Sequence, residues 1–185
     1  LGKIMAETNQ LDSAEYYFKS ATSLFASINY ESSQANAFNS LASVYEHQNK
    51  MPLAKLYLEK ALAINISMED TSGMGVNYMN LANLALKQGN TSEAEKLNTK
   101  ARNLVKPEMN FSLYAELFAQ AADIASKKQQ FDKAYNFLQL FNMYRDSIRN
   151  EKLGKQQEEI EAIYQNEKKQ QQLQLANAEN EKKTL

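Results

Sequence analysis

Cysteine and tryptophan are absent from this sequence of 185 residues, and proline, glycine and histidine are scarce, with two, five and one copies. Without cysteine the chain can form neither a disulfide nor a thiolate metal site. The single histidine, His47, has no second histidine to complete a usual zinc site, so no metal is expected. The scarcity of proline and glycine permits long, uninterrupted helices.

Two further absences concern membranes and nucleic acids. No apolar run approaches the roughly 20 residues that a membrane-spanning helix requires. The net charge is -1 and the isoelectric point about 6.0, so no basic field favours nucleic acid. The sequence starts with Leu1 rather than methionine, which we interpret as a fragment of a longer protein. We expect no membrane insertion and no nucleic-acid binding by these residues, and cytoplasmic and periplasmic locations both stay open.

Motifs that carry chemistry are also missing. The sequence has no Gly-x-x-x-x-Gly-Lys phosphate loop. The segment 73–75, Gly-Met-Gly, is only part of a dinucleotide motif, and either loose packing at a helix entry or room for a close neighbour explains it better. No Ser-His-Asp or Cys-His arrangement can be assembled, and Glu158, Glu159 and Glu161 are interpreted as a solvated helix face. We predict no catalytic residue, no cofactor and no enzymatic activity here, while a kinase in a longer parent protein stays open.

The sequence does contain a helical hairpin pattern over residues 38–62. Two apolar faces with the i, i+3, i+4, i+7 type of helical spacing flank a polar break at residues 47–50. The first face consists of Phe38, Leu41, Ala42 and Tyr45. The second consists of Ala54, Leu58, Ala61 and Leu62. Two such faces cannot both be buried within one hairpin, so the unit needs neighbours.

The hairpin pattern recurs with a period of 40 residues. Small residues repeat at Ala14, Ala54, Ala94 and Ala134, and again at Gly2, Ala42, Ala82 and Ala122. A large residue repeats at Phe38, Tyr78 and Phe118. A fixed period of this length predicts a solenoid, in which each unit covers the apolar face of the next.

The pattern large-x-x-Leu-Ala-x-x-Tyr, then a turn, then Ala-x-x-x-Leu-x-x-Ala, resembles the tetratricopeptide repeat. The best match is made by Phe38, Leu41, Ala42, Tyr45, Ala54, Leu58 and Ala61. The resemblance covers residues 1 to about 146, with a period of 40 in place of the usual 34 or so. It implies an all-α fold, a right-handed superhelix of antiparallel helix pairs followed by a long C-terminal helix.

Helix signals divide the chain into a solenoid over residues 1–149 and an extension over residues 150–185. In the solenoid, a first repeat truncated at its N-terminus precedes three complete helix pairs. Predicted helices span residues 12–28, 32–47, 51–67, 71–88, 92–105, 108–128 and 131–149. Capping boxes are predicted at Asp12 with Glu15 and at Ser92 with Glu95. Pro52 and Pro107 are expected to open helices.

The extension is rich in glutamine, glutamate and lysine and poor in apolar residues. Four of its apolar side chains form one narrow stripe, spaced 7, 4 and 11 residues apart, which favours an 11-residue helical period. The stripe consists of Leu153, Ile160, Tyr164 and Leu175. We interpret the extension as a long charged helix that forms a homodimer through this stripe. A disordered tail, or packing against another part of a parent protein, are the alternatives.

The resemblance also indicates a ligand-binding face, because the first helices of tetratricopeptide pairs line the concave side of the superhelix. The implied ligand positions are Asn36, Asn39, Ser43, Asn80, Asn83, Lys87, Gln120 and Asp123. An amide carries a donor and an acceptor, so it can bind a peptide backbone of any sequence. We predict a protein or peptide ligand, and the alternative is that these polar residues only keep a groove soluble. Glu116 has the wrong charge for a carboxylate clamp.

The order of parts, repeats followed by a long charged helix, resembles the input region of bacterial tetratricopeptide sensor histidine kinases. That resemblance implies a sensory module of a two-component system. It would lie outside the cytoplasmic membrane if a signal peptide precedes it and a membrane span follows. The input region of a helix-turn-helix transcription regulator and a free-standing scaffold or adaptor are the alternatives.

Overall fold

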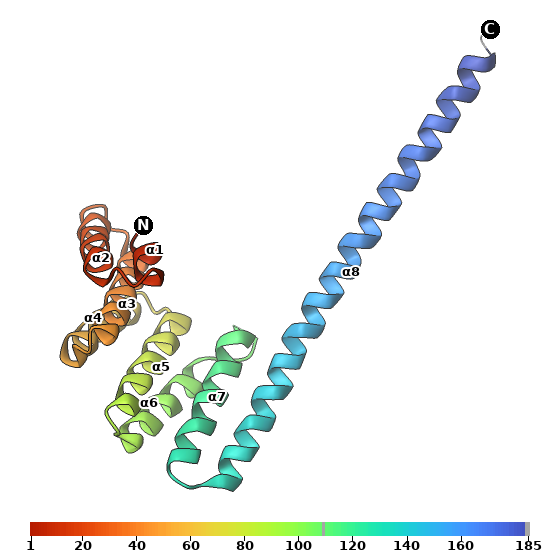
Figure 1. The fold of residues 1–185 in the computed structure, drawn as a ribbon. Helices are drawn as coiled ribbons and strands as arrows, with labels where there is room; N and C mark the ends of the chain where they lie inside the picture. Colours follow the sequence, from red (N-terminus) through yellow and green to blue (C-terminus); the bar gives the residue numbers. More distant parts are fainter. Residues whose placement is uncertain (109, 184–185) are drawn as a thin grey trace. The chain divides into compact units, whose positions relative to one another are not determined.

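The computed structural model describes residues 1–108 and 110–183, with the side chains of this range except those of 151, 153, 154, 167 and 171–183. All regular elements of the described residues are α-helices, which confirms the predicted all-α class (Figure 1). The helices are α1 (Gly2–Glu7), α2 (Leu11–Ser27), α3 (Glu31–His47), α4 (Met51–Ser67), α5 (Thr71–Lys87), α6 (Thr91–Leu104), α7 (Phe111–Lys127) and α8 (Phe131–Lys183).

The chain divides into two compact units, Leu1–Tyr144 and Arg145–Leu185. The first contains α1 to α7 and the beginning of α8, and the second contains the rest of α8. The predicted boundary between residues 149 and 150 falls inside α8, and the division into domains stays a prediction. Although α8 is 53 residues long, neither it nor another described helix has a stretch apolar enough to span a bilayer.

The helices begin at a regular interval. The starts of α2 to α8 are 20 residues apart, at 11, 31, 51, 71, 91, 111 and 131. Most turns contain one residue in the left-handed region, which lets the chain reverse directly after a helix. These residues are Asn9, Asn29, Asn49, Glu69, Gly89 and Gln129. At the second turn, for example, the amide of Tyr30 donates to the carbonyl of Phe25 across the left-handed Asn29 (2.9 Å). Half of the sequence period is therefore one helix and one turn.

Two predicted capping residues prove wrong, although the helices begin within one residue of the predicted positions. At α6 the side chain of Asn90, rather than Ser92, accepts a hydrogen bond from the amide of Glu93 (3.1 Å). At α2 the N-cap is Gln10, which makes no side-chain cap bond. Asp12 instead accepts a hydrogen bond from Gln48 of α3 (3.3 Å). Both predicted capping boxes are thus incorrect.

Only one of the two prolines lies at the start of a helix. Pro52 lies in the first turn of α4, as predicted. Pro107 does not open a helix, because α7 begins at Phe111, where Asn110 accepts a hydrogen bond from the amide of Leu113 (2.9 Å). The connection that contains Pro107 places the buried Val105 against Gly75 of α5. A side chain at position 75 would collide with Val105, so this glycine does provide room for a close neighbour.

The repeated small residues lie in the interfaces between helices. Ala14, Ala54 and Ala94 are completely buried, and so are Ala42 and Ala82. These positions let successive helices pack closely, and Figure 1 shows α1 to α7 as neighbouring helices of the first unit. Larger apolar side chains, such as Leu41 and Leu58, fill the space around them. The repeated alanines therefore set the distance between helices, as their spacing in the sequence predicts.

Ala54→Leu is expected to destabilise the fold by about 1–3 kcal/mol, because the larger side chain overpacks a completely buried interface. Ala63→Leu is the matched control, since Ala63 lies on the same helix but is exposed. The measurement is urea unfolding followed by circular dichroism. Equal midpoints for the two variants would contradict the assignment of Ala54 to a tight interface.

Candidate binding face

A hollow of about 540 Å³ lies at the N-terminal end of the face formed by the first helices of the pairs. Lys3, Ala6 and Glu7 of α1 and Ser40, Ser43, Val44 and His47 of α3 line it, together with Phe18 of α2. Ser43, one of the predicted ligand residues, is exposed in this hollow. Asn36 is also exposed and precedes Ser40 and Ser43 by one and two helical turns on the same face of α3.

The chemistry of the hollow is mixed. Phe18 and Val44 provide apolar surface, Ser40 and Ser43 provide hydroxyl groups, and His47 provides an imidazole. Lys3 and Glu7 provide one charge of each sign. Such a lining can hydrogen-bond a polypeptide backbone and cover an apolar side chain. It has no excess of positive charge with which to hold a strongly anionic ligand.

Asn39, another predicted ligand residue, belongs to a network of amides between helices. Asn65 of α4 donates from Nδ2 to Oδ1 of Asn77 in α5 (2.5 Å). Asn77 in turn donates from Nδ2 to Oδ1 of Asn39 in α3 (2.7 Å). Asn77 is completely buried and Asn65 is 4% exposed, so the bond between these two amides is shielded from water. The Asn39 carbonyl therefore has a structural partner from the next repeat.

Gln120 and Asn83 form the second such network, one repeat later. Asn98 of α6 donates from Nδ2 to Oε1 of Gln120 in α7 (3.0 Å). Gln120 donates from Nε2 to Oδ1 of Asn83 in α5 (2.6 Å) and to the carbonyl of Met79 (2.8 Å). Gln120 is buried, with 8% exposed, so its amide holds α5, α6 and α7 together.

Both networks link a second helix to the first helices on either side of it. Their residues, however, are not spaced by the 40-residue period of the repeat. Asn39 and Asn83 are 44 residues apart, and Asn77 and Gln120 are 43 apart, so on the first helices the second network lies about one helical turn further along than the period of 40 predicts. Sequence analysis missed Asn65, Asn77 and Asn98 for this reason. The feature of the sequence that could have identified them is an asparagine at a helical position that faces the interior.

The remaining predicted ligand residues differ in their surroundings. Lys87 of α5 forms an ion pair with Glu46 of α3 (2.5 Å), which links two successive first helices. Asp123 pairs with Lys127 one turn along α7 (3.2 Å). Asn80 is half-buried, and its side chain has no hydrogen bond within the described part of the chain. Of the predicted residues, Asn36, Ser43 and Asn80 therefore have side chains without a hydrogen bond or ion pair in the described part of the chain, and Asp123 pairs only within its own helix.

The predicted dimerisation stripe lies on α8, in the second unit. Ile160 and Tyr164 are 67% and 56% exposed, and Ile163 beside them is 54% exposed. The side chains of Leu153 and Leu175 lie outside the described residues. In the part of the stripe that is described, apolar side chains are thus open to solvent.

Titratable groups offer little further chemistry. Within the described ranges, no three His, Asp or Glu side chains are grouped so that they could hold a metal ion. A hydrogen bond from Lys19 lowers the pKa of Glu15, which also accepts from Tyr45 (3.0 Å), and this cluster joins α2 to α3. Burial is the main cause that raises the pKa of Tyr45. The main cause of the Glu15 pKa shift thus lies one turn along α2, whereas the pKa of Tyr45 is shifted where α3 packs against its neighbours.

Comparisons with known proteins agree with this geometry. Residues 33–106 match the family model of the tetratricopeptide repeat, while a search of curated proteins finds no match. The structure of BtubC (BKLC) from P. vanneervenii is similar, with a TM-score of 0.69 and 18% identity over 80% of this chain and 62% of that chain. A Podosopora anserina putative kinesin light chain with nearly identical TPR-like repeats gives a TM-score of 0.64 and 15% identity, covering 81% of this chain and 74% of that one.

These comparisons confirm the fold class. The chain is an all-α, tetratricopeptide-like array of helix pairs, as the sequence resemblance implies. The identities are low, so the solved structures show the fold alone. The chain spans less than two thirds of BtubC. The matches do not support the finer resemblance to a sensor histidine kinase.

Asn77→Leu is expected to lower the free energy of unfolding by about 1–3 kcal/mol, because it leaves the amide groups of Asn65 and Asn39 without their partner. Asn36→Leu, on the exposed face of α3, is the control and should stay within about 0.5 kcal/mol of the wild type. Chemical denaturation of the two variants measures the difference. An Asn77→Leu variant as stable as the control would show that the network does not stabilise the array.

Proposed function

We propose that this chain is a protein-binding module, which receives an extended peptide segment along the face of α1, α3 and α5. The observation that supports the proposal most directly is the hollow beside α3, which is lined by both apolar and polar side chains. Asn36 and Ser43 on α3 and Asn80 on α5 offer hydrogen-bonding groups on that face. Their chemistry suits peptide groups, which need one donor and one acceptor per residue.

The amide networks support the same proposal in a different way. Asn77 connects α5 to Asn39 of α3, and Gln120 connects α7 to Asn83 of α5. These bonds fix one first helix against the next, so the exposed groups beside them are held in place before a ligand arrives. A preorganised face loses less conformational entropy on binding than a mobile one.

A finer role is the input region of a bacterial signalling protein, either a sensor histidine kinase or a helix-turn-helix regulator. The continuous helix α8, which runs from Phe131 to Lys183, supports it because a helix of this length could connect repeats to a further domain. A free-standing scaffold or adaptor is equally compatible with the fold. The reading frame of the parent gene distinguishes them, since a kinase or DNA-binding domain after these repeats is expected only in the signalling protein.

We also propose that a second copy of the chain covers the apolar stripe of α8. Ile160, Ile163 and Tyr164 are more than half exposed, and a partner helix would bury them. An isolated helix with few apolar residues is weakly stabilised, because most helix stability in proteins comes from a packed face. The interspersed charges around the stripe are suited to the flanks of such a pair.

The peptide-binding proposal is tested with peptides selected from a displayed library on the wild-type chain. Replacing Asn36, Ser43 and Asn80 by alanine should weaken binding about tenfold or more, since each neutral hydrogen bond contributes about 0.5–1.5 kcal/mol. The measurement is fluorescence anisotropy of the labelled peptide. The matched control replaces Ser13, Asn103 and Asn142, which are exposed on second helices. Selected peptides that bind the site variant as tightly as the control variant would refute the assignment of this face.

Dimerisation is tested on the full chain by analytical ultracentrifugation. Ile160→Glu with Tyr164→Glu should shift the chain towards monomer, because two like charges on each copy would be buried in the pair. Gln156→Glu with Gln157→Glu adds the same charge to exposed polar positions of α8 and should leave association unchanged. Wild type that stays monomeric at high concentration would rule out self-association by this stripe.

A further inference from the structure

Two cavities occur at equivalent places in successive repeats. The first, of about 190 Å³, lies between α4, α5 and α6, and the second, of about 160 Å³, lies between α6, α7 and α8. Leu84, Ala85 and Leu97 line the first, and Ile124, Ala125 and Phe137, each 40 residues later, line the second. The cavities are therefore features of the repeat itself, formed where an alanine of a first helix faces two successive second helices.

One repeat earlier, the residue equivalent to Ala85 is Tyr45. Its side chain is only 2% exposed and lies between α2 and α4. The ring stacks on Tyr57 of α4, with centroids 5.3 Å apart, and the hydroxyl donates to Oε1 of Glu15 in α2 (3.0 Å). In this repeat a tyrosine thus occupies the space that an alanine leaves open in each of the next two repeats.

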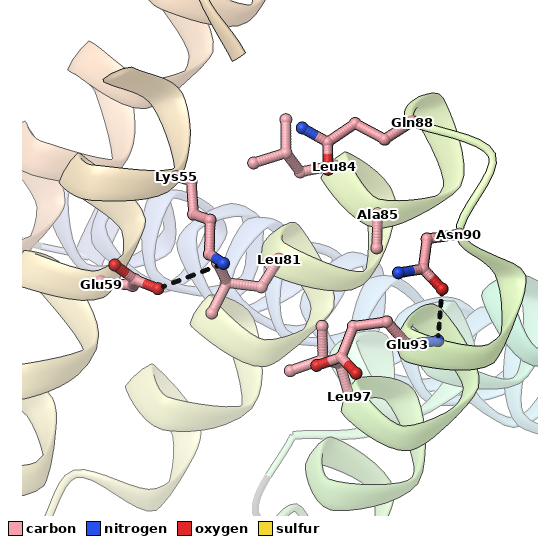
Figure 2. Close-up of a pocket in the computed structure, with 9 residues that line it drawn as sticks. All are labelled: Lys55, Glu59, Leu81, Leu84, Ala85, Gln88, Asn90, Glu93 and Leu97. Atoms are coloured by element: carbon pink, nitrogen blue, oxygen red, sulfur yellow. Dashed lines mark hydrogen bonds and ion pairs between the residues drawn. The ribbon is translucent and has the colours of Figure 1, made fainter. Parts of the chain in front are cut away.

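The first cavity keeps the features that hold Tyr45. Leu84 and Leu97 stand where Val44 and Tyr57 stand beside Tyr45, so an apolar surface for a ring is present. Figure 2 shows Ala85 projecting between the side chains of α4 and those of α6. Lys55 and Glu59 form an ion pair at the rim (3.8 Å), and both are more than half exposed. The ion pair stands at the positions of Glu15 and Lys19 with the charges exchanged.

The second cavity is less open to a ring because the chain fills part of it. The guanidinium of Arg102 lies 5.0 Å from the ring centroid of Phe137 and 5.6 Å from that of Phe118. Arg102 also donates to Oδ1 of Asn98 (2.8 Å). An aromatic ring is already present there as Phe137, whereas the equivalent residue of the first cavity is Leu97.

We propose that the cavity between α4 and α6 receives a tyrosine side chain of a partner protein, in the position that Tyr45 takes one repeat earlier. The ring packs on Leu84 and Leu97, and the hydroxyl donates to a rim carboxylate, Glu59 or Glu93. Lys55 at the same rim can lie over the negative face of the ring. This site goes beyond the peptide-binding face of α1, α3 and α5, since α4 and α6 supply most of its rim.

The occupant is a tyrosine rather than an aliphatic residue for two reasons. The internal example at the equivalent position is Tyr45, which uses both its ring and its hydroxyl. The rim also carries two carboxylates, Glu59 and Glu93, beside one ammonium group, so it offers acceptors to a phenolic donor. A leucine side chain would fill the apolar base but would offer no donor to these carboxylates.

The test titrates the full ¹⁵N-labelled chain with acetyl-Gly-Tyr-Gly-amide and, separately, with acetyl-Gly-Leu-Gly-amide. The tyrosine peptide should cause saturable shifts in the backbone amides of residues 84–97, and the leucine peptide should cause smaller shifts that do not saturate. Equal responses to the two peptides, or shifts from the tyrosine peptide that lie only on α1 and α3, would overturn the proposal.

Ala85→Tyr supplies the ring from within the chain. It should abolish the shifts caused by the tyrosine peptide and raise the melting temperature, because it fills the cavity. Ala26→Tyr adds the same side chain at an exposed position of α2 and should leave the shifts intact. Ala85→Leu is a second occluding variant if Ala85→Tyr does not fold. A folded occluding variant that still shows the saturable shifts would overturn the proposal.

Discussion

The close approach of helices at completely buried alanines is the contact on which the rest of this structure depends. Ala14, Ala54 and Ala94 recur every 40 residues and are entirely shielded from solvent. Because a methyl group keeps neighbouring backbones close, larger side chains such as Leu58 can interdigitate around these points. The turns reinforce the arrangement, since a left-handed residue after most helices reverses the chain within a few residues.

Close packing brings buried polar groups within reach of one another, and the amide networks follow from it. Asn77 and Gln120 each accept from a second helix and donate to the preceding first helix. A buried amide without partners is costly, whereas a satisfied one restricts how helices can slide. The networks therefore help to hold successive repeats in register, and they do not involve the side chains of Asn36, Ser43 and Asn80.

The backbone of the repeat is regular, but different side chains fill the space between a first helix and the two second helices beside it. Tyr45, Ala85 and Ala125 are equivalent positions, yet the first is a buried ring and the other two border cavities. Small side chains at an otherwise well-packed junction leave a recess whose shape the rest of the array maintains. Binding capacity can thus arise on the second helices as well as on the first, and from the same repeat geometry.

The sequence by itself determined the period, the helices to within a few residues, and the buried positions of Ala54 and Leu58, because helical spacing encodes which side of a helix is apolar. It also indicated that a long helix follows Phe131. Only the tertiary structure decided which polar residues are used between helices: Asn36 and Asn39 are three residues apart on one helix, yet only Asn39 meets Asn77. The physical reason is that such contacts depend on the offset between neighbouring helices. That offset, about one turn between the two networks, is set by packing rather than by any local pattern of residues.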